Sequence, residues 1–320
     1  MGVFTRLDER QIAAALADYG LTATAVVGVP EGSVNTWYRV DALGGRYFLR
    51  LDERDDVAAV DAELRVLDAL AGMSVPRVVP ARDGRRVTSV AGKPCLLFEA
   101  LHGASHAACE LTAAQLSALG RTVAAMHAAP VPPGLAPHRF YPRRVYESLY
   151  LPVRERVVAE HPEAAAALAA AFAGGWEPYA FEGLPRAIVH GDLFADNVLF
   201  ERDAVTGVLD FEAAGVGPRL FDVAVAVHAL CFDVAARTFE GERARALVDG
   251  YRAETALTAA EVAAWPEVLR YAGQRFLVTR LRDFEMRPGA REAGTWKDYR
   301  EYLDHLGALD VVVGLVESPG

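Results

Sequence analysis

Lysine, cysteine and long apolar runs are scarce in this sequence. Among its 33 basic residues only Lys93 and Lys297 are lysines, so arginine carries almost all of the positive charge. The 43 acidic residues give a net charge of −10, which argues against nonspecific binding to nucleic acid or anionic lipid. The three cysteines are widely spaced and form no CxxC pair, which argues against a disulfide framework or a zinc site and suits a reducing compartment.

The sequence also lacks the apolar stretches that secretion and membrane insertion require. Its first 20 residues are charged and amphipathic, without the apolar core or cleavage signature of a signal peptide. Uncharged stretches such as 164–173 and 223–230 are far shorter than the roughly 20 residues of a membrane span. We therefore expect a cytoplasmic protein with neither a membrane nor a nucleic-acid partner. Apolar residues are abundant, at 52% of 320 positions, which is enough for two domains or one large one.

The first hundred residues show the pattern of β-strands with one helix among them. Two aromatic and β-branched runs, 34–41 and 46–52, are separated by Ala-Leu-Gly-Gly and indicate a β-hairpin. Residues 57–70 change to a helical period, and 86–99 indicate a second hairpin that turns at Ala-Gly-Lys.

Beyond residue 103 helical patterns dominate. Thr112 and Gln115 resemble a capping box, and residues 162–173 form an alanine-dense helical stretch. A β insert interrupts the helices, with short strands expected at 187–189, 198–201 and 207–210. The sequence therefore predicts a β-rich N-terminal lobe over residues 1–98, a hinge over 99–103 and a mainly helical lobe over 104–320.

The strongest functional signal lies in that β insert. It reads IVHGDLFADNVLF over residues 188–200, followed by GVLDFE over 207–212. Asp192 follows one expected strand, Asn197 comes just before the next, and Asp210 is expected to end a third. Carboxylate and amide oxygens at such strand ends suit Mg²⁺, which takes one or two protein carboxylates together with water and phosphate oxygens. A further carboxylate beside the ion can orient a hydroxyl group and accept its proton.

Each of these residues taken singly is more often a turn residue than a ligand. The complete string HGDxxxxN followed by DF is a different matter, because it is the catalytic-loop arrangement of kinases. Two positions depart from that arrangement: glycine replaces arginine after the histidine, and glutamate replaces glycine after Asp-Phe. The full pattern favours a catalytic site over a set of turns.

The HGDLFADNVLF segment resembles the motif of the aminoglycoside phosphotransferase and choline kinase superfamily. Its Leu-Phe-x-Asp-Asn-Val portion is particularly similar to type II homoserine kinases, and residues 274–281 and 297–306 resemble their C-terminal helices. The resemblance implies an α+β, protein-kinase-like fold of two lobes. It also implies an enzyme that uses ATP and Mg²⁺ to phosphorylate a hydroxyl group of a small molecule, with homoserine as the first candidate.

The resemblance assigns roles to individual residues. Asp192 matches the catalytic base, and Asn197 and Asp210 match the metal ligands. His190 is expected to brace the loop, and Asp222 matches a buried aspartate that holds the loop in place. Nucleotide binding is expected at Ser33, Asn35, Arg50, Glu63 and Glu99.

Arg50 is the sharpest departure from the family pattern. The phosphate-binding lysine of the family should lie on the second strand of the first hairpin, where this chain has Arg50, ahead of Glu63 on the first helix. Arginine can bind phosphate with both arms of its guanidinium group, although it is larger than lysine. Arg50 is therefore either a replacement that keeps the charge or the sign of a weakened site. If it has neither role, it is an edge-strand arginine facing solvent.

Three residues are candidates for contact with the substrate. Glu212, after Asp-Phe, would neighbour a cationic part of the substrate or support the metal ion. Arg275 and Arg280 lie in a segment that would line the acceptor site, and either one could meet a substrate carboxylate or form an ordinary salt bridge. The alternative functions are a kinase for an aminoglycoside, a choline-like amine or a sugar, a protein-serine kinase of similar fold, and a nucleotide-binding pseudokinase that acts as a regulator.

Overall fold

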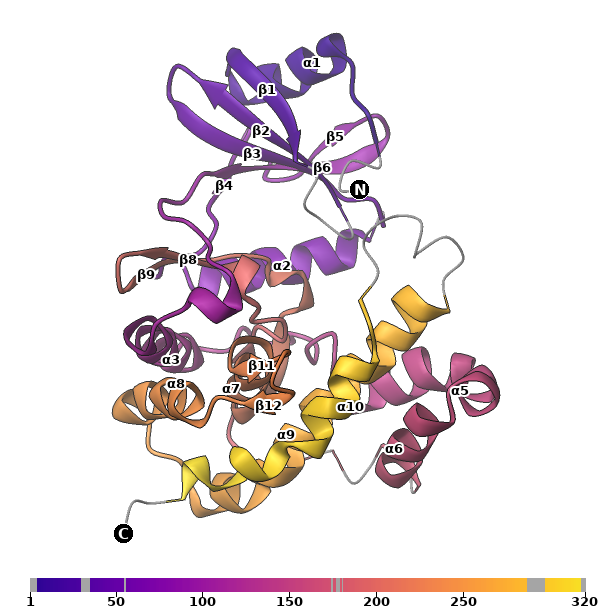
Figure 1. Ribbon diagram of the computed structural model, residues 1–320. Coiled ribbons are helices and arrows are strands. Elements are labelled where there is room, and N and C mark those ends of the chain that lie inside the picture. Colours follow the sequence, from indigo (N-terminus) through magenta and orange to yellow (C-terminus); the bar gives the residue numbers. More distant parts are fainter. Residues whose placement is uncertain are drawn as a thin grey trace.

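The computed structural model describes residues 5–29, 35–54, 56–173, 175–176, 179, 181–286 and 297–317. Figure 1 shows a β-sheet with helix α1 at one end of the molecule and a larger, mainly helical body at the other. This arrangement agrees with the predicted β-rich N-terminal part and helical C-terminal part. The boundary at residues 99–103 remains a prediction, and no helix in the described ranges is long and apolar enough to cross a membrane.

An antiparallel sheet forms the N-terminal region. Its strands are β1 (Ala23–Val29), β2 (Thr36–Ala42), β3 (Gly45–Leu51), β4 (Val78–Val79), β5 (Thr88–Val90) and β6 (Lys93–Glu99). They pair in the order β1-β2-β3-β6-β4, and β5 pairs with β6. Both predicted hairpins, β2–β3 and β5–β6, are confirmed. Because β3 lies between β2 and β6, its side chains are sheltered from the sheet edge, and Leu49 and Leu51 are fully buried.

The expectation of a single helix in this region was wrong. Helix α1 (Glu9–Tyr19) precedes the sheet, with Asp8 and Gln11 forming a capping box at its start. Its buried side chains, Leu16 among them, pack against the sheet. The sequence signal was weak because alanine fills four of the eleven positions of α1, so only Ile12, Leu16 and Tyr19 supply large side chains to a narrow apolar face. Strand β1 was also not predicted; none of its residues is fully buried.

Helix α2 (Val57–Ala69) connects the two regions. Val60, Leu64 and Leu67 are buried in the same apolar cluster as Phe98 of the sheet and the interior of the helical body. Asp56 caps the start of α2 by accepting a hydrogen bond from Ala59 N at 3.0 Å. This packing fixes the face of α2 that carries Glu63.

The helical body is built around α3 (Ala113–His127), α7 (Leu220–Leu230), α8 (Gly241–Glu254) and α9 (Ala259–Arg280). The predicted capping box at Thr112 and Gln115 begins α3. Helices α3 and α8 approach so closely that a Cβ atom on Gly120 would collide with the Leu247 carbonyl oxygen. The remaining helices are α4 (Pro142–Arg144), α5 (Arg154–Glu160), α6 (Pro162–Phe172) and α10 (Arg300–Gly307).

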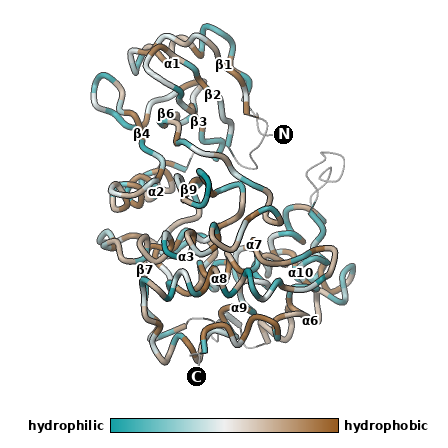
Figure 2. Tube along the Cα trace, turned by 60° about the vertical axis from the view of Figure 1, so that its left-hand side comes forward, coloured by the Kyte–Doolittle hydropathy of each residue, from teal (hydrophilic) through white to brown (hydrophobic). Residues whose placement is uncertain are grey.

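Short strand pairs carry the site segment. Strand β7 (Arg186–Val189) pairs with β10 (Gly215–Pro218), and β8 (Val198–Glu201) pairs with β9 (Ala204–Val208). The predicted strand at 207–210 was misplaced: β9 ends at Val208, so Asp210 lies beyond it. Strand β10 and the pair β11 (Phe232–Asp233) and β12 (Thr238–Phe239) were not predicted, because the Gly-Val-Gly-Pro of β10 has the composition of a turn and the other two are only two residues long. Figure 2 shows the turn beside β9 as a hydrophilic segment.

Candidate active site

A buried aspartate on α7 holds the backbone of the loop that follows β7. Asp222 accepts hydrogen bonds from the backbone N–H groups of His190 and Gly191, each at 2.7 Å, and from His127 Nε2 at 3.1 Å. Burial by itself would raise the pKa of Asp222, but these donors lower it below its ordinary value. Gly191 has a φ of 80°, which a glycine adopts without strain. Asp222 thus fixes the backbone that leads into Asp192.

His190 ties the same loop to the Asp210 segment. The ring is fully buried; Nε2 donates to the Leu209 carbonyl at 2.8 Å, and Nδ1 accepts from the Asp192 backbone N–H at 3.2 Å. Nδ1 is therefore engaged by the loop itself, and Nε2 is engaged by the Asp210 segment. This arrangement is that of a brace, as expected from the sequence.

Asp192 points away from the loop toward a buried arginine. Arg275 Nη2 donates to Asp192 Oδ1 at 2.9 Å and to the Gly191 carbonyl at 3.2 Å. The Arg275 guanidinium lies 3.3 Å from the centroid of the Phe140 ring, which restricts its position. Burial lowers the pKa of Arg275, and the Asp192 carboxylate opposes that shift. With about a third of its side chain exposed, Asp192 keeps a surface for another molecule.

Asn197 comes just before the β8–β9 hairpin and Asp210 just after it, so both lie at the open end of the hairpin. Asn197 Nδ2 donates to the Asp192 carbonyl at 2.9 Å, and its backbone carbonyl accepts from Leu209 N at 2.8 Å. Asp210 has a φ of 62°, an uncommon left-handed conformation for a residue with a side chain and one that occurs at functional sites. These bonds bring the Asn197 and Asp210 segments together, and they attach Asn197 to the backbone of Asp192.

Several acidic side chains lie near Asp210. Although part of the residue is accessible to solvent, the protein that surrounds its carboxyl group raises the pKa to about 8, and the carboxylates of Glu212 and Asp192 add to the rise. Such a group gains most from a nearby cation, which would favour its charged form. A carboxylate with an amide oxygen is a hard donor set that fits Mg²⁺. No cluster of three His, Cys, Asp or Glu side chains suited to a metal ion occurs in the described ranges.

On the sheet side, Arg50 is buried and paired. Its Nη1 and Nη2 donate to Glu63 Oε1 and Oε2 at 2.8 and 2.6 Å, and the side chain is 1% exposed. Its guanidinium lies 5.6 Å from the Trp37 ring and 5.3 Å from the Phe98 ring. Burial by itself would lower the pKa of Arg50, but the Glu63 carboxylate raises it above its ordinary value. The alternative of a solvent-facing edge-strand arginine was wrong, because β3 is an inner strand.

Glu212 connects the two halves of the site. It accepts from Asn35 Nδ2 at 2.5 Å, and its carboxylate lies 3.0 Å from Arg54 Nη2 and 3.5 Å from Arg50 Nη1. The sequence suggested a cationic substrate group or a metal ion as its neighbour; the structure places it against two cations of the chain itself. Arg54 was missed, because an arginine in the turn after β3 carries no motif.

The other predicted residues lie apart from this group. Glu99 ends β6, where its N–H donates to the Arg77 carbonyl at 3.0 Å. Arg280 pairs with Glu301 of α10 at 2.6 Å, on the next turns of α9 beyond Arg275. Ser33 lies outside the described residues.

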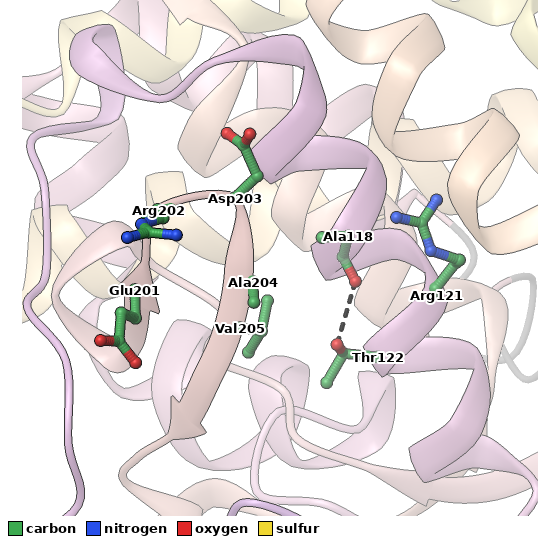
Figure 3. Close-up of a pocket in the computed structure, with 8 residues that line it drawn as sticks. All are labelled: Ala118, Arg121, Thr122, Glu201, Arg202, Asp203, Ala204 and Val205. Atoms are coloured by element: carbon green, nitrogen blue, oxygen red, sulfur yellow. Dashed lines mark hydrogen bonds between the residues drawn. The ribbon is translucent and has the colours of Figure 1, made fainter.

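A surface hollow of about 860 Å³ lies elsewhere, over α3 and the β8–β9 hairpin (Figure 3). Its lining contains both cations and anions, such as Arg121, Arg202, Glu201 and Asp203, which alternate around it. None of its lining residues belongs to the group around Asp192. The candidate active site is therefore the group around Asp192 and not this hollow.

Comparison with known proteins decides the family. The model of the phosphotransferase enzyme family matches residues 25–261. The chain belongs to this family. It is 34% identical over 313 residues to the homoserine kinase of Gluconacetobacter diazotrophicus, covering 96% of both chains. The homoserine kinase of Azorhizobium caulinodans is 33% identical over 310 residues, with 96% of this chain and 95% of that enzyme covered.

Solved structures share the fold at lower identity. A spectinomycin phosphotransferase in complex with ADP and spectinomycin aligns with a TM-score of 0.70 at 14% identity, over 96% of this chain and all of that one. A microcompartment-associated aminopropanol kinase aligns with a TM-score of 0.63 at 23% identity, over 96% and 99% of the two chains. The predicted superfamily and kinase-like two-lobe fold are confirmed, and the chain is a small-molecule kinase.

Proposed function

We propose that this chain is a homoserine kinase that uses ATP and Mg²⁺ and transfers the γ-phosphate to the homoserine hydroxyl. The observation that carries the proposal is the full-length similarity to homoserine kinases, at 34% identity over 96% of both chains. The catalytic-loop geometry agrees with such a reaction, because Asp192, Asn197 and Asp210 project from segments bonded to one another. The role of each residue below is part of the proposal.

Asn197 and Asp210 would hold the metal ion. The amide oxygen Oδ1 of Asn197 accepts no hydrogen bond among the described residues, since only its Nδ2 is engaged. The surrounding protein and the nearby acidic groups raise the pKa of Asp210, and a bound cation would favour the charged form of its carboxyl group. When bound, Mg²⁺ would neutralise charge on the phosphates.

Asp192 would orient the acceptor hydroxyl and accept its proton. The hydroxyl oxygen forms a bond to the γ-phosphorus, the bond from that phosphorus to the β–γ bridging oxygen breaks, and ADP leaves with the electron pair. Because Arg275 occupies Oδ1 of Asp192, the second oxygen is the one available to the hydroxyl. The buried Arg275 therefore holds the carboxylate in one orientation, which is the contribution that positioning makes to such reactions.

The direct test measures which acceptor supports ATP consumption. Purified protein is assayed with Mg²⁺ and homoserine, 1-aminopropan-2-ol, choline, kanamycin or simple sugars, and the product is identified by ³¹P NMR. We expect turnover with homoserine and a phosphate ester on its hydroxyl, and none with the Asp192→Asn variant. Turnover with another acceptor alone would contradict homoserine as the substrate, and no ATP consumption with any acceptor would favour the nucleotide-binding pseudokinase.

A further inference from the structure

The Glu212 carboxylate, which comes from the helical body, lies against two arginines of the sheet region, Arg50 and Arg54. Glu212 is 9% exposed, and both of its oxygens are engaged: Oε1 by Asn35 and Arg50, Oε2 by Arg54. All three partners come from the N-terminal part of the chain, at or after the loop that precedes β2. Glu212 therefore links the two regions through charge.

Arg54 does not depend on Glu212 for its position. Its Nη2 lies 3.2 Å from Asp52 Oδ2, and its backbone N–H donates to Asp52 Oδ1 at 3.0 Å. Asp52 is fully buried, so this attachment is fixed to the end of β3. If Glu212 moved away, Arg54 would stay in place as a cation facing the interior.

Arg50 likewise has a terminal nitrogen that faces Glu212, and its Nε is buried without a hydrogen-bond partner among the described residues. Glu63 takes both terminal nitrogens of its guanidinium group, and the remaining contact of Nη1 is the 3.5 Å approach to Glu212. That direction is the one from which Arg50 can meet an anion. Arg50, Arg54 and Asn35 thus converge on one anionic group, which in this structure is the Glu212 carboxylate.

We propose that Glu212 is an internal stand-in for a nucleotide phosphate: it pairs with Arg50 and Arg54 in the nucleotide-free protein, and a phosphate of the nucleotide displaces it. Arg54 is then a second phosphate-binding cation beside Arg50. The inference rests on the proposed use of ATP. Two anions cannot share these donors without strong repulsion, so the Glu212 carboxylate and the phosphate compete. The link between the two regions is released when nucleotide binds.

The test measures the affinity for ADP without metal, in EDTA, by titration calorimetry. Glu212→Gln removes the competing charge and keeps the side-chain size, so it should bind ADP about ten times more tightly than wild type. Arg54→Ala should bind about ten times more weakly, and Arg54→Lys should retain most of the affinity. Matched controls are Glu160→Gln on α5 and Arg46→Ala on β3, which change the same charges in exposed pairs elsewhere.

A second measurement follows the link itself. Hydrogen exchange of the Glu53 backbone N–H, which donates to Asn35 Oδ1 at 2.9 Å, should be faster in Glu212→Gln than in wild type when no nucleotide is present, because the variant weakens the contact that holds Asn35 from its other side. ADP should slow this exchange in both proteins to a similar rate, because the phosphate replaces the carboxylate. Thermal unfolding of each variant shows whether it is folded.

The outcomes separate this inference from the function on which it rests. Wild type that fails to bind ADP contradicts the proposed nucleotide use. Wild type that binds ADP, with unchanged or weaker metal-free affinity in Glu212→Gln, overturns the stand-in role. Loss of Mg·ADP affinity alone in that variant would make Glu212 a metal-binding residue and would also overturn it. Unchanged affinity in Arg54→Ala would remove Arg54 from the phosphate site.

Discussion

Arg275 Nη2 lies 2.9 Å from Asp192 Oδ1, and the same guanidinium is stacked on Phe140. The sequence left Arg275 open between contact with a substrate carboxylate and a salt bridge, and the structure shows a salt bridge to Asp192, the expected catalytic base. This pair suggests that Asp192 is oriented before the substrate arrives. Changing either Asp192 or Arg275 should therefore lower kcat much more than it lowers the affinity for nucleotide.

For Asp192→Asn we expect turnover to fall to background while ADP affinity stays within a few-fold of wild type. In the proposed mechanism Asp192 acts on the acceptor hydroxyl and makes no contact that nucleotide binding requires. For Arg275→Lys, which keeps the charge but not the planar stack on Phe140, we expect an intermediate loss of kcat with little change in the KM for ATP. Steady-state kinetics with calorimetry checks both; substantial kcat in Asp192→Asn would remove its assigned role.

Asp210→Asn should weaken Mg·ADP binding by at least about tenfold, since disturbing even the partners of metal ligands costs about that much. Metal-free ADP should bind about as well as before, because a carboxyl group with a pKa of about 8 carries little charge at neutral pH for the variant to remove. Parallel titrations with Mg²⁺ and with EDTA distinguish the two. Equal losses under both conditions would contradict a metal-ligand role.

Arg50→Ala should lower the stability of the protein and also raise its KM for ATP. It leaves Glu63, only 6% exposed, without its partner, and breaking a buried ion pair in this way costs about 3–5 kcal/mol. Arg50→Lys should recover part of the stability and of the ATP KM, because an ammonium group meets one oxygen of Glu63 but lacks the second arm. Urea unfolding and kinetics of both variants check this; wild-type values in Arg50→Ala would show that the pair contributes nothing.

The sequence placed Asp192, Asn197 and Asp210 near one another because they are close along the chain, although Asp210 lies two residues beyond the end of β9. The spacing from Asp192 to Asn197 and the position of Asp210 follow from short strands with turn residues between them. The contacts of Glu212 could not be predicted, since Asn35 is 177 residues away and only the packing of the two regions brings them together. The partner of Arg280 could not be predicted either, because Glu301 belongs to another helix, α10.

Helix α3 meets α8 at two glycines, Gly120 and Gly250, whose added Cβ atoms would each strike backbone of the other helix. Gly120→Ala should therefore lower the free energy of unfolding by about 1–3 kcal/mol, the usual cost of overpacking. Gly307→Ala at the end of α10 is a matched control, because nothing lies within 4 Å of its added Cβ. Urea unfolding of both variants checks the difference; equal stabilities would mean that the two helices separate without cost.

Two buried histidines should make the stability depend on pH. Burial lowers the pKa of His138 and of His228 from 6.5 to about 3 each; Arg275 adds to the shift at His138 and His305 adds to it at His228. Because both pKa values are lower in the folded state, the unfolded chain binds more protons between about pH 3 and 6.5. Their contribution to stability is fully present above pH 6.5 and is lost as the pH falls through that window.

The expected slope of this loss is about 1.4 kcal/mol per pH unit for each histidine. The ring of His138 packs 4.7 Å from that of Phe221, so His138→Phe removes the titrating group and keeps an aromatic ring in its place. The free energy of unfolding of this variant should therefore fall less steeply with acid than that of wild type, by the slope of one proton. Urea unfolding at steps between pH 7 and 4.5 gives both slopes. Identical slopes would show that His138 stays neutral in the unfolded chain as well, or is already protonated in the folded one, and either result contradicts the lowered pKa.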